Sequence, residues 1–153
     1  MEALARAVDS GRYILGPEVE AFEQEFSALT HCPPGLACAS GTDALALALR
    51  ALGVVPGDEV ILPAMTAFAT AAAVKQIGSI PKLVDIRKET RCMDPKLLEA
   101  AITEATKAVI FVHLYGFPTH DALMVQKICA KHRVKLLEDC AQCTTGSIGQ
   151  QRI

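Results

Sequence analysis

An acidic pair and a glutamine stand where an apolar part of the chain ends. Glu138 and Asp139 close the last apolar run, and Gln142 follows three residues after Asp139. A carboxylate at the end of a buried strand points into a crevice, where it needs a cation or hydrogen-bond donors. The protonated ring nitrogen of a bound cofactor would be such a cation, and Gln142 could donate a hydrogen bond to the same ligand. The alternative for Asp139 is a helix cap or a helix-dipole contact.

The segment 40–43 reads Ser-Gly-Thr-Asp and precedes a stretch rich in Ala and Leu. Unpaired N–H groups and the helix dipole make such a helix start suitable for an anion, and Gly41 lets an anion approach the backbone. The alternative is a simple N-cap, for which Ser, Thr and Asp are preferred. The segment is neither a Walker A motif nor G-x-G-x-x-G, so a P-loop or dinucleotide site is disfavoured.

Cys140 and Cys143 form a C-x-x-C pair, which is found in thiol redox sites and in zinc sites. A thioredoxin-like site is disfavoured because Thr-Thr-Gly follows where a helix would have to run. A zinc site is disfavoured because the sequence has no companion C-x-x-C or H-x₃₋₅-H motif, so we expect no metal. Most of the cysteines are expected to be reduced core thiols. His113 is expected to have a hydrogen-bonded structural role, with a pocket-facing role as the alternative.

Strand and helix patterns alternate along the chain. The strands are continuous apolar runs, whereas the helices have apolar residues three and four apart or are rich in Ala and Leu. This order predicts an α/β fold, doubly wound, in which a mostly parallel sheet has helices on both faces and ligands bind beyond the carboxyl ends of its strands. We expect strands at 36–39, 59–62, 82–86, 108–113 and 134–138 and helices at 18–29, 42–52, 66–77, 94–102 and 120–132.

Composition narrows the function classes. The 153 residues carry a formal net charge of −2, and 21% of them are charged, with both signs scattered along the chain. This distribution offers no basic stripe for nucleic acid and no polybasic segment for a membrane surface. The apolar runs are far shorter than the roughly 20 residues needed to cross a bilayer, and residues 1–6 do not resemble a signal peptide. We therefore expect one cytoplasmic domain that contacts neither nucleic acid nor membrane.

Six segments together resemble the DegT/DnrJ/EryC1/StrS family of sugar aminotransferases, vitamin B6 enzymes with the aspartate aminotransferase fold (fold type I). Each segment is common by itself, but their order and spacing are specific and extend over nearly the whole chain. The segments are GRYILGPEV (11–19), SGTDAL (40–45), PGDEVILPA (56–64), VDI (84–86), VHLYG (112–116) and EDCAQ (138–142).

The resemblance implies a site for pyridoxal 5′-phosphate. The phosphate cradle of the family falls on the backbone of Gly41 and Thr42. Its aspartate that pairs with the pyridine nitrogen falls on Asp139, and its glutamine near the ring hydroxyl falls on Gln142. A carboxylate that keeps the ring nitrogen protonated lets the cofactor act as an electron sink.

One position departs from the family pattern. An aromatic side chain usually stacks on the cofactor ring directly after the Thr of a Pro-x-x-Thr turn. In this chain Ala67 occupies that position and Phe68 follows. Either Phe68 turns inward or the smaller Ala67 covers the ring face.

The resemblance places the lysine that forms the Schiff base in a segment after Ile153, beyond a hairpin that residues 146–153 begin. Lys135 lies four residues before Asp139 on the same strand, about 13 Å away at ~3.3 Å per residue, and cannot replace it. We therefore expect residues 1–153 to be the N-terminal part of the cofactor-binding large domain, without a catalytic residue and without the C-terminal small domain. Family members are homodimers whose sites borrow residues from the partner subunit.

The leading hypothesis is transfer of an amino group from glutamate or glutamine to a keto sugar linked to a nucleotide, carried out by the parent enzyme and not by this chain alone. A second hypothesis is a sugar dehydratase, because some family members have histidine in place of the lysine. A third is a non-catalytic α/β fragment that binds a phosphate-bearing ligand or a partner chain through an open sheet edge. A redox role for the C-x-x-C pair is a fourth.

Overall fold

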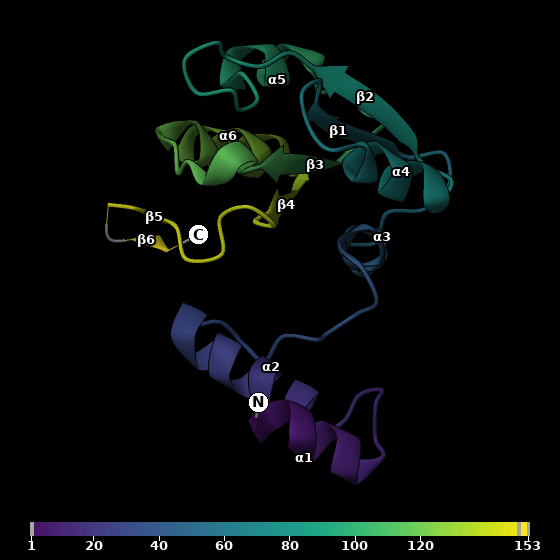
Figure 1. Cartoon of the computed structure of the whole chain (residues 1–153). Coiled ribbons are helices and arrows are strands. Elements are labelled where there is room, and N and C mark those ends of the chain that lie inside the picture. Colours follow the sequence, from purple (N-terminus) through teal and green to yellow (C-terminus); the bar gives the residue numbers. More distant parts are fainter. Residues whose placement is uncertain (1, 150, 153) are drawn as a thin grey trace. The chain divides into compact units, whose positions relative to one another are not determined.

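The structure is a computed structural model that describes residues 2–149 and 151–152. The chain forms two compact units, Met1–Ala39 and Ser40–Ile153 (Figure 1). No helix of the described residues is long and apolar enough to cross a membrane.

The first unit is a pair of helices, α1 (Glu2–Ser10) and α2 (Pro17–Thr30). Pro17 occupies the first turn of α2, where its missing N–H costs no helical hydrogen bond. Arg6 of α1 and Glu18 of α2 form an ion pair at 2.8 Å. The predicted helix 18–29 is confirmed, whereas α1 was not predicted.

The predicted strand at residues 36–39 is wrong. The segment has no regular secondary structure, and the side chain of Leu36 is 91% exposed. A strand needs the N–H and C=O groups of a neighbour, and the sheet of the described chain contains no ladder with this segment. The N–H of Ala37 instead donates to the Glu23 carboxylate of α2.

The second unit is built on a four-stranded sheet in the order β2-β1-β3-β4, with every neighbouring pair parallel. The α/β class with a parallel sheet is thus confirmed. The strands are β1 (Glu59–Pro63), β2 (Ile80–Val84), β3 (Thr106–Val112) and β4 (Lys135–Asp139), and the helices are α3 (Gly41–Ala51), α4 (Phe68–Gln76), α5 (Pro95–Ala101) and α6 (His120–His132).

The strand predicted at 82–86 begins two residues earlier than expected. Ile80 already pairs with Glu59, although Pro81 is the next residue. A proline is tolerated here because β2 is an edge strand, so its missing N–H removes no ladder hydrogen bond on the open side.

The sheet buries both of its faces. Val60 and Leu62 of β1 pack with residues of α3 and α4, whereas Ile61, between them in sequence, packs with residues of α5 and α6. The same alternation in β3 places Ile110 in the first cluster and Phe111 in the second. Two covered faces confirm the doubly wound arrangement.

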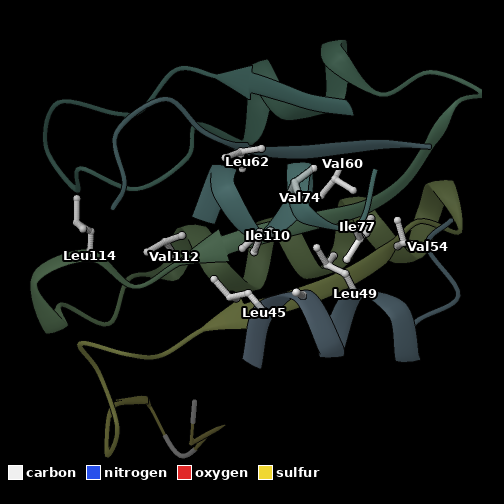
Figure 2. Close-up of a cluster of buried hydrophobic side chains, with 13 residues drawn as sticks. Leu45, Leu49, Val54, Val60, Leu62, Val74, Ile77, Ile110, Val112 and Leu114 are labelled. Carbon is white, nitrogen blue, oxygen red and sulfur yellow. The ribbon is translucent and has the colours of Figure 1, made fainter. Parts of the chain in front are cut away.

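The helices α3 and α4 begin at the edge where the strands end. Figure 2 shows Leu45 of α3 toward the end of the cluster where Val112 and Leu114 lie. Leu49, one turn later in α3, lies toward Val54 and Ile77. The N-terminus of α3 is therefore at the carboxyl edge of the sheet.

After β4 the chain forms a short antiparallel hairpin of β5 (Ser147–Ile148) and β6 (Gln151–Arg152). Ile148 packs into the cluster on the α5/α6 face. The hairpin expected within residues 146–153 is thus confirmed for these strands, while residues 150 and 153 lie outside the described part.

Candidate functional site

Asp139 is the last residue of β4 and lies on the α3/α4 face of the sheet. It is the register partner of Val112, and partners in a ladder point to the same face. Val112 belongs to the cluster that contains α3 and α4 residues, as does the neighbouring Leu137. Asp139 is half-buried, and its Oδ1 accepts a hydrogen bond from the N–H of Ala141 at 3.1 Å. Among the described residues, no helix begins after Asp139, so the alternative of a helix cap is not met, and Oδ2 accepts no hydrogen bond.

Gln142 has a fixed amide orientation. Its Oε1 accepts a hydrogen bond from the backbone N–H of Tyr115 at 2.6 Å. Since the oxygen is engaged by a donor, the amide nitrogen is the atom left to contact a ligand, and it can only donate. The side chain is exposed at the sheet edge and offers a hydrogen-bond donor there.

The short 3-10 turn η1 (Leu114–Gly116) holds the segment that carries Asp139 and Gln142. The N–H of His113 donates to the carbonyl of Asp139 at 3.1 Å. Gly116 has a φ of +73°, and a Cβ built on it would lie 2.5 Å from the carbonyl oxygen of Gln142. A glycine is required at 116 because both the backbone conformation and this close approach exclude a side chain.

The start of α3 retains two backbone donors. The Ser40 hydroxyl accepts from the N–H of Asp43 at 3.1 Å and donates to its carboxylate at 2.8 Å, which confirms the capping role of the segment. The cap uses only the third N–H of the helix. In the described part of the chain, the N–H groups of Gly41 and Thr42 have no protein acceptor, and a Cβ at Gly41 would meet nothing within 4 Å. An anion can therefore approach these two donors.

Ala67 and Phe68 form the start of α4, with Ala67 at the N-cap position. The Phe68 ring is 84% exposed and makes no ring contact among the described residues. The starts of α3 and α4 share a face and an edge of the sheet with Asp139, so a ligand could bridge them.

His113 and Glu138 occupy the other face. His113 is completely buried, its Nε2 lies 2.9 Å from Oε2 of Glu138, and its ring packs edge-on against Phe111 with 5.0 Å between the centroids. Phe111 belongs to the α5/α6 cluster. His113 thus has the hydrogen-bonded structural environment that was expected for it.

Sequence reasoning missed a cavity of about 450 Å³ beside η1. Its lining includes Lys88, Arg91 and Tyr115, and the Arg91 guanidinium lies 5.5 Å from the centre of the Tyr115 ring. Both residues have left-handed backbone conformations, with φ of 56° and 62°. None of the six expected site residues lines this cavity. A usable signal was available, because residues 85–91 follow β2 directly at the ligand-binding edge.

Among the described cysteines, Cys92, Cys129 and Cys143 are buried. Burial raises the pKa of Cys129 to about 11 and also raises the pKa of Cys92. These thiols remain protonated and unreactive at neutral pH. Cys140 is half-buried and Cys32 and Cys38 are exposed, so the expectation that most of the cysteines are core thiols holds for three of the six.

The parallel sheet defines an α/β protein, a class in which ligands bind beyond the carboxyl ends of the strands. The chain belongs to the DegT/DnrJ/EryC1/StrS aminotransferase family, whose model matches residues 1–153. Its relatives are enzymes with the fold type I cofactor domain, which confirms the expected fold.

Three similar proteins illustrate this membership. UDP-N-acetyl-3-dehydro-alpha-D-glucosamine 3-aminotransferase of Acidithiobacillus ferrooxidans is 43% identical over 100% of this chain and 41% of its own length. The structure of DesV from S. venezuelae in complex with a ketimine intermediate has a TM-score of 0.94 and 43% identity, covering 99% of this chain and 41% of DesV. The structure of a GDP-4-keto-6-deoxymannose-3-dehydratase with a trapped PLP-glutamate geminal diamine has a TM-score of 0.88 and 28% identity. The match covers 99% of this chain and 40% of the dehydratase. The chain thus spans about two fifths of the length of these relatives.

Proposed function

We propose that this chain is the cofactor-binding part of a pyridoxal-phosphate-dependent aminotransferase that acts on a nucleotide-linked keto sugar. The observation that carries the proposal is the position of Asp139 on the same face and edge of the sheet as the unused N–H groups of α3. An anion site and a carboxylate on one crevice suit a ligand with a phosphate and a cationic ring. The similarity to an aminotransferase of a UDP-linked sugar supports the substrate class.

The residues present fit this cofactor. Gly41 and Thr42 would donate their N–H groups to the phosphate, because their N–H groups are the ones that the Ser40 cap leaves unused. Asp139 would hold the proton on the ring nitrogen through its uncommitted Oδ2. Gln142 would donate its amide N–H to the ring hydroxyl, since its oxygen is engaged by Tyr115. When bound, the cofactor supplies an electron sink for proton transfer at the substrate carbon.

Ala67 and Phe68 would lie beside the ring at the start of α4. Phe68 is exposed as it stands, so covering the ring requires it to change its rotamer, whereas Ala67 is already in place at the helix N-cap. We infer that the lysine of the amine chemistry belongs to a segment following residue 153. Amino transfer from glutamate or glutamine is then a property of the longer protein, which we expect to pair as a homodimer.

A second candidate function is dehydration of a nucleotide-linked keto sugar. The similarity to a GDP-4-keto-6-deoxymannose-3-dehydratase favours it, although its identity is 28% compared with 43% for the aminotransferase. Both functions use the same cofactor site, so the residues of this chain serve either reaction. The residue that takes the place of the Schiff-base lysine decides between them.

The experiment is a titration of the 153-residue chain with pyridoxal 5′-phosphate, followed by absorbance and by intact mass after borohydride reduction. We expect saturable, reversible binding without a covalent adduct, and at least about tenfold weaker binding for Asp139→Ala, which loses a charge-assisted contact. Asp85→Ala is the matched control, because Asp85 also follows a strand at this edge but lies outside the proposed site. Absence of binding would contradict the proposal and favour a non-catalytic fragment. A stoichiometric adduct on one lysine would contradict the assignment of the lysine to a later segment.

A further inference from the structure

Three side chains with metal-binding atoms meet at the ends of β3 and β4. One ligating atom from each of His113, Glu138 and Cys140 lies within 4.8 Å of the other two. None of the three belongs to the proposed cofactor site. His113 directly follows β3, Glu138 is the second-last residue of β4, and Cys140 directly follows β4.

This face is opposite to the one that carries Asp139. Glu138 is the register partner of Phe111, whose ring belongs to the α5/α6 cluster, whereas Asp139 pairs with Val112 of the α3/α4 cluster. Glu138, which contacts His113, and Asp139 therefore point to opposite faces of the sheet. None of His113, Glu138 and Cys140 is therefore among the residues proposed to bind the cofactor.

The imidazole of His113 is incompletely satisfied. Its Nε2 contacts Glu138, but its Nδ1 is buried without a hydrogen-bond partner in the described chain. The ring is immobilised by complete burial, whereas the Glu138 side chain is 34% exposed and Cys140 is half-buried. Solvent can thus reach the cluster from the Glu138 and Cys140 side.

We propose that His113, Glu138 and Cys140 bind a zinc ion. Imidazole nitrogen, carboxylate oxygen and thiolate sulfur are the three ligand types that zinc prefers, and three protein ligands leave one position for water. Binding releases the thiol proton of Cys140 and replaces the contact between His113 and Glu138 by two bonds to the metal. The sequence contains no second C-x-x-C motif, and the structure supplies a histidine and a glutamate in its place.

The geometry requires a small rearrangement, in which the 2.9 Å contact between His113 and Glu138 widens and the longer separations in the cluster shorten. Bonds of about 2.0–2.3 Å in a tetrahedron place ligand atoms about 3.3–3.6 Å apart, compared with separations of up to 4.8 Å here. The partly exposed Glu138 and Cys140 can supply this movement, while the buried His113 remains fixed. Cys143, the other cysteine of the pair, is turned away, with its Sγ 3.7 Å from the carbonyl oxygen of Gly116.

The test is a zinc titration of the reduced chain in competition with a chromogenic chelator, followed by metal analysis after desalting. We expect one zinc per chain. Each of Cys140→Ser, Glu138→Gln and His113→Gln should weaken binding by at least about tenfold, the loss that even outer-shell substitutions cause at metal sites. Cobalt in place of zinc should give a thiolate charge-transfer band that disappears in Cys140→Ser.

The controls are Cys143→Ser and Cys32→Ser, which should leave zinc affinity unchanged. Because His113 is fully buried, circular dichroism should establish that His113→Gln folds, and the partly exposed Glu138→Gln decides the outcome if it does not. Failure to retain zinc would overturn the proposal. So would binding that depends on both Cys140 and Cys143 but on neither Glu138 nor His113, because two thiolates would then hold the metal.

Discussion

At the carboxyl edge, the polar groups on the two faces of the sheet differ in how many hydrogen-bond partners they have within the chain. On the α3/α4 face, the N–H groups of Gly41 and Thr42 and one oxygen of Asp139 have no partner in the described chain. On the α5/α6 face, the buried Asp121 accepts hydrogen bonds from Arg87 at 2.8 Å and from Thr90 at 2.7 Å. The contrast is between donors and an acceptor that remain available to a ligand and a network around Asp121 that is satisfied within the chain and contributes to stability.

The largest expected effect comes from removing the carboxylate at the centre of the Asp121 network. Asp121→Ala removes two hydrogen bonds to a carboxylate whose side chain is 4% exposed, so we expect a loss of about 1–3 kcal/mol in the free energy of unfolding. Urea unfolding followed by circular dichroism measures it. Glu104→Ala is the control, since Glu104 is exposed and has no hydrogen bond in the described chain. Equal stability of the two variants would show that the Asp121 network contributes nothing.

The next effect concerns the η1 turn that supports the open face. Gly116→Ala introduces a Cβ 2.5 Å from the Gln142 carbonyl in a left-handed backbone, where a side chain costs about 1–2 kcal/mol in general. We expect both lower stability and weaker binding of pyridoxal phosphate, because the segment with Asp139 and Gln142 must shift.

Gly53→Ala separates the two effects of that substitution. Gly53 has a φ of +86° but nothing within 4 Å of a built Cβ, so it shares the backbone strain without the collision. It should lose stability and keep its ligand affinity. Loss of affinity in both glycine variants would contradict a positioning role for Gly116.

The smallest effect lies at the amino edge of the sheet. Burial raises the pKa of Glu59, but hydrogen bonds from Thr106 and Lys82 outweigh it and leave that pKa below its usual value of 4.5. A depressed pKa in the folded state stabilises the fold above the unfolded pKa, and this contribution is lost as the pH falls through the folded pKa. We expect Glu59→Gln to lower stability by about 1 kcal/mol at neutral pH and to flatten the loss of stability below about pH 4. Urea midpoints over this pH range test it, and an unchanged pH profile would contradict it.

The helices and most strands followed from local signals. The helix predicted at 120–132 matches α6 in both bounds, because Thr119 caps its start and Arg133 ends it in a left-handed conformation. The strand prediction at 36–39 was wrong because an apolar run does not reveal whether a neighbouring strand exists to pair with it. Strand β2 was placed late because Pro81 interrupts a strand pattern everywhere except at a sheet edge.

Some features of the candidate site could also be predicted from local sequence, whereas others depend on contacts between distant parts of the chain. The positions of Gly41 and Asp139 at a helix start and a strand end could be read from the sequence. The orientation of the Gln142 amide could not, because it depends on the N–H of Tyr115, 27 residues earlier in the chain. The meeting of His113 with Cys140 likewise depends on the pairing of β3 with β4.

The most direct test of the central claim compares two neighbours on one strand. Asp139 and Glu138 are adjacent acids at the end of β4, but alternation places them on opposite faces. Pyridoxal 5′-phosphate affinity is measured for Asp139→Asn and Glu138→Gln in buffer freed of metal by a chelator. Our account predicts at least about tenfold weaker binding for Asp139→Asn and unchanged binding for Glu138→Gln. Equal affinities in the two variants, or a loss confined to Glu138→Gln, would contradict it.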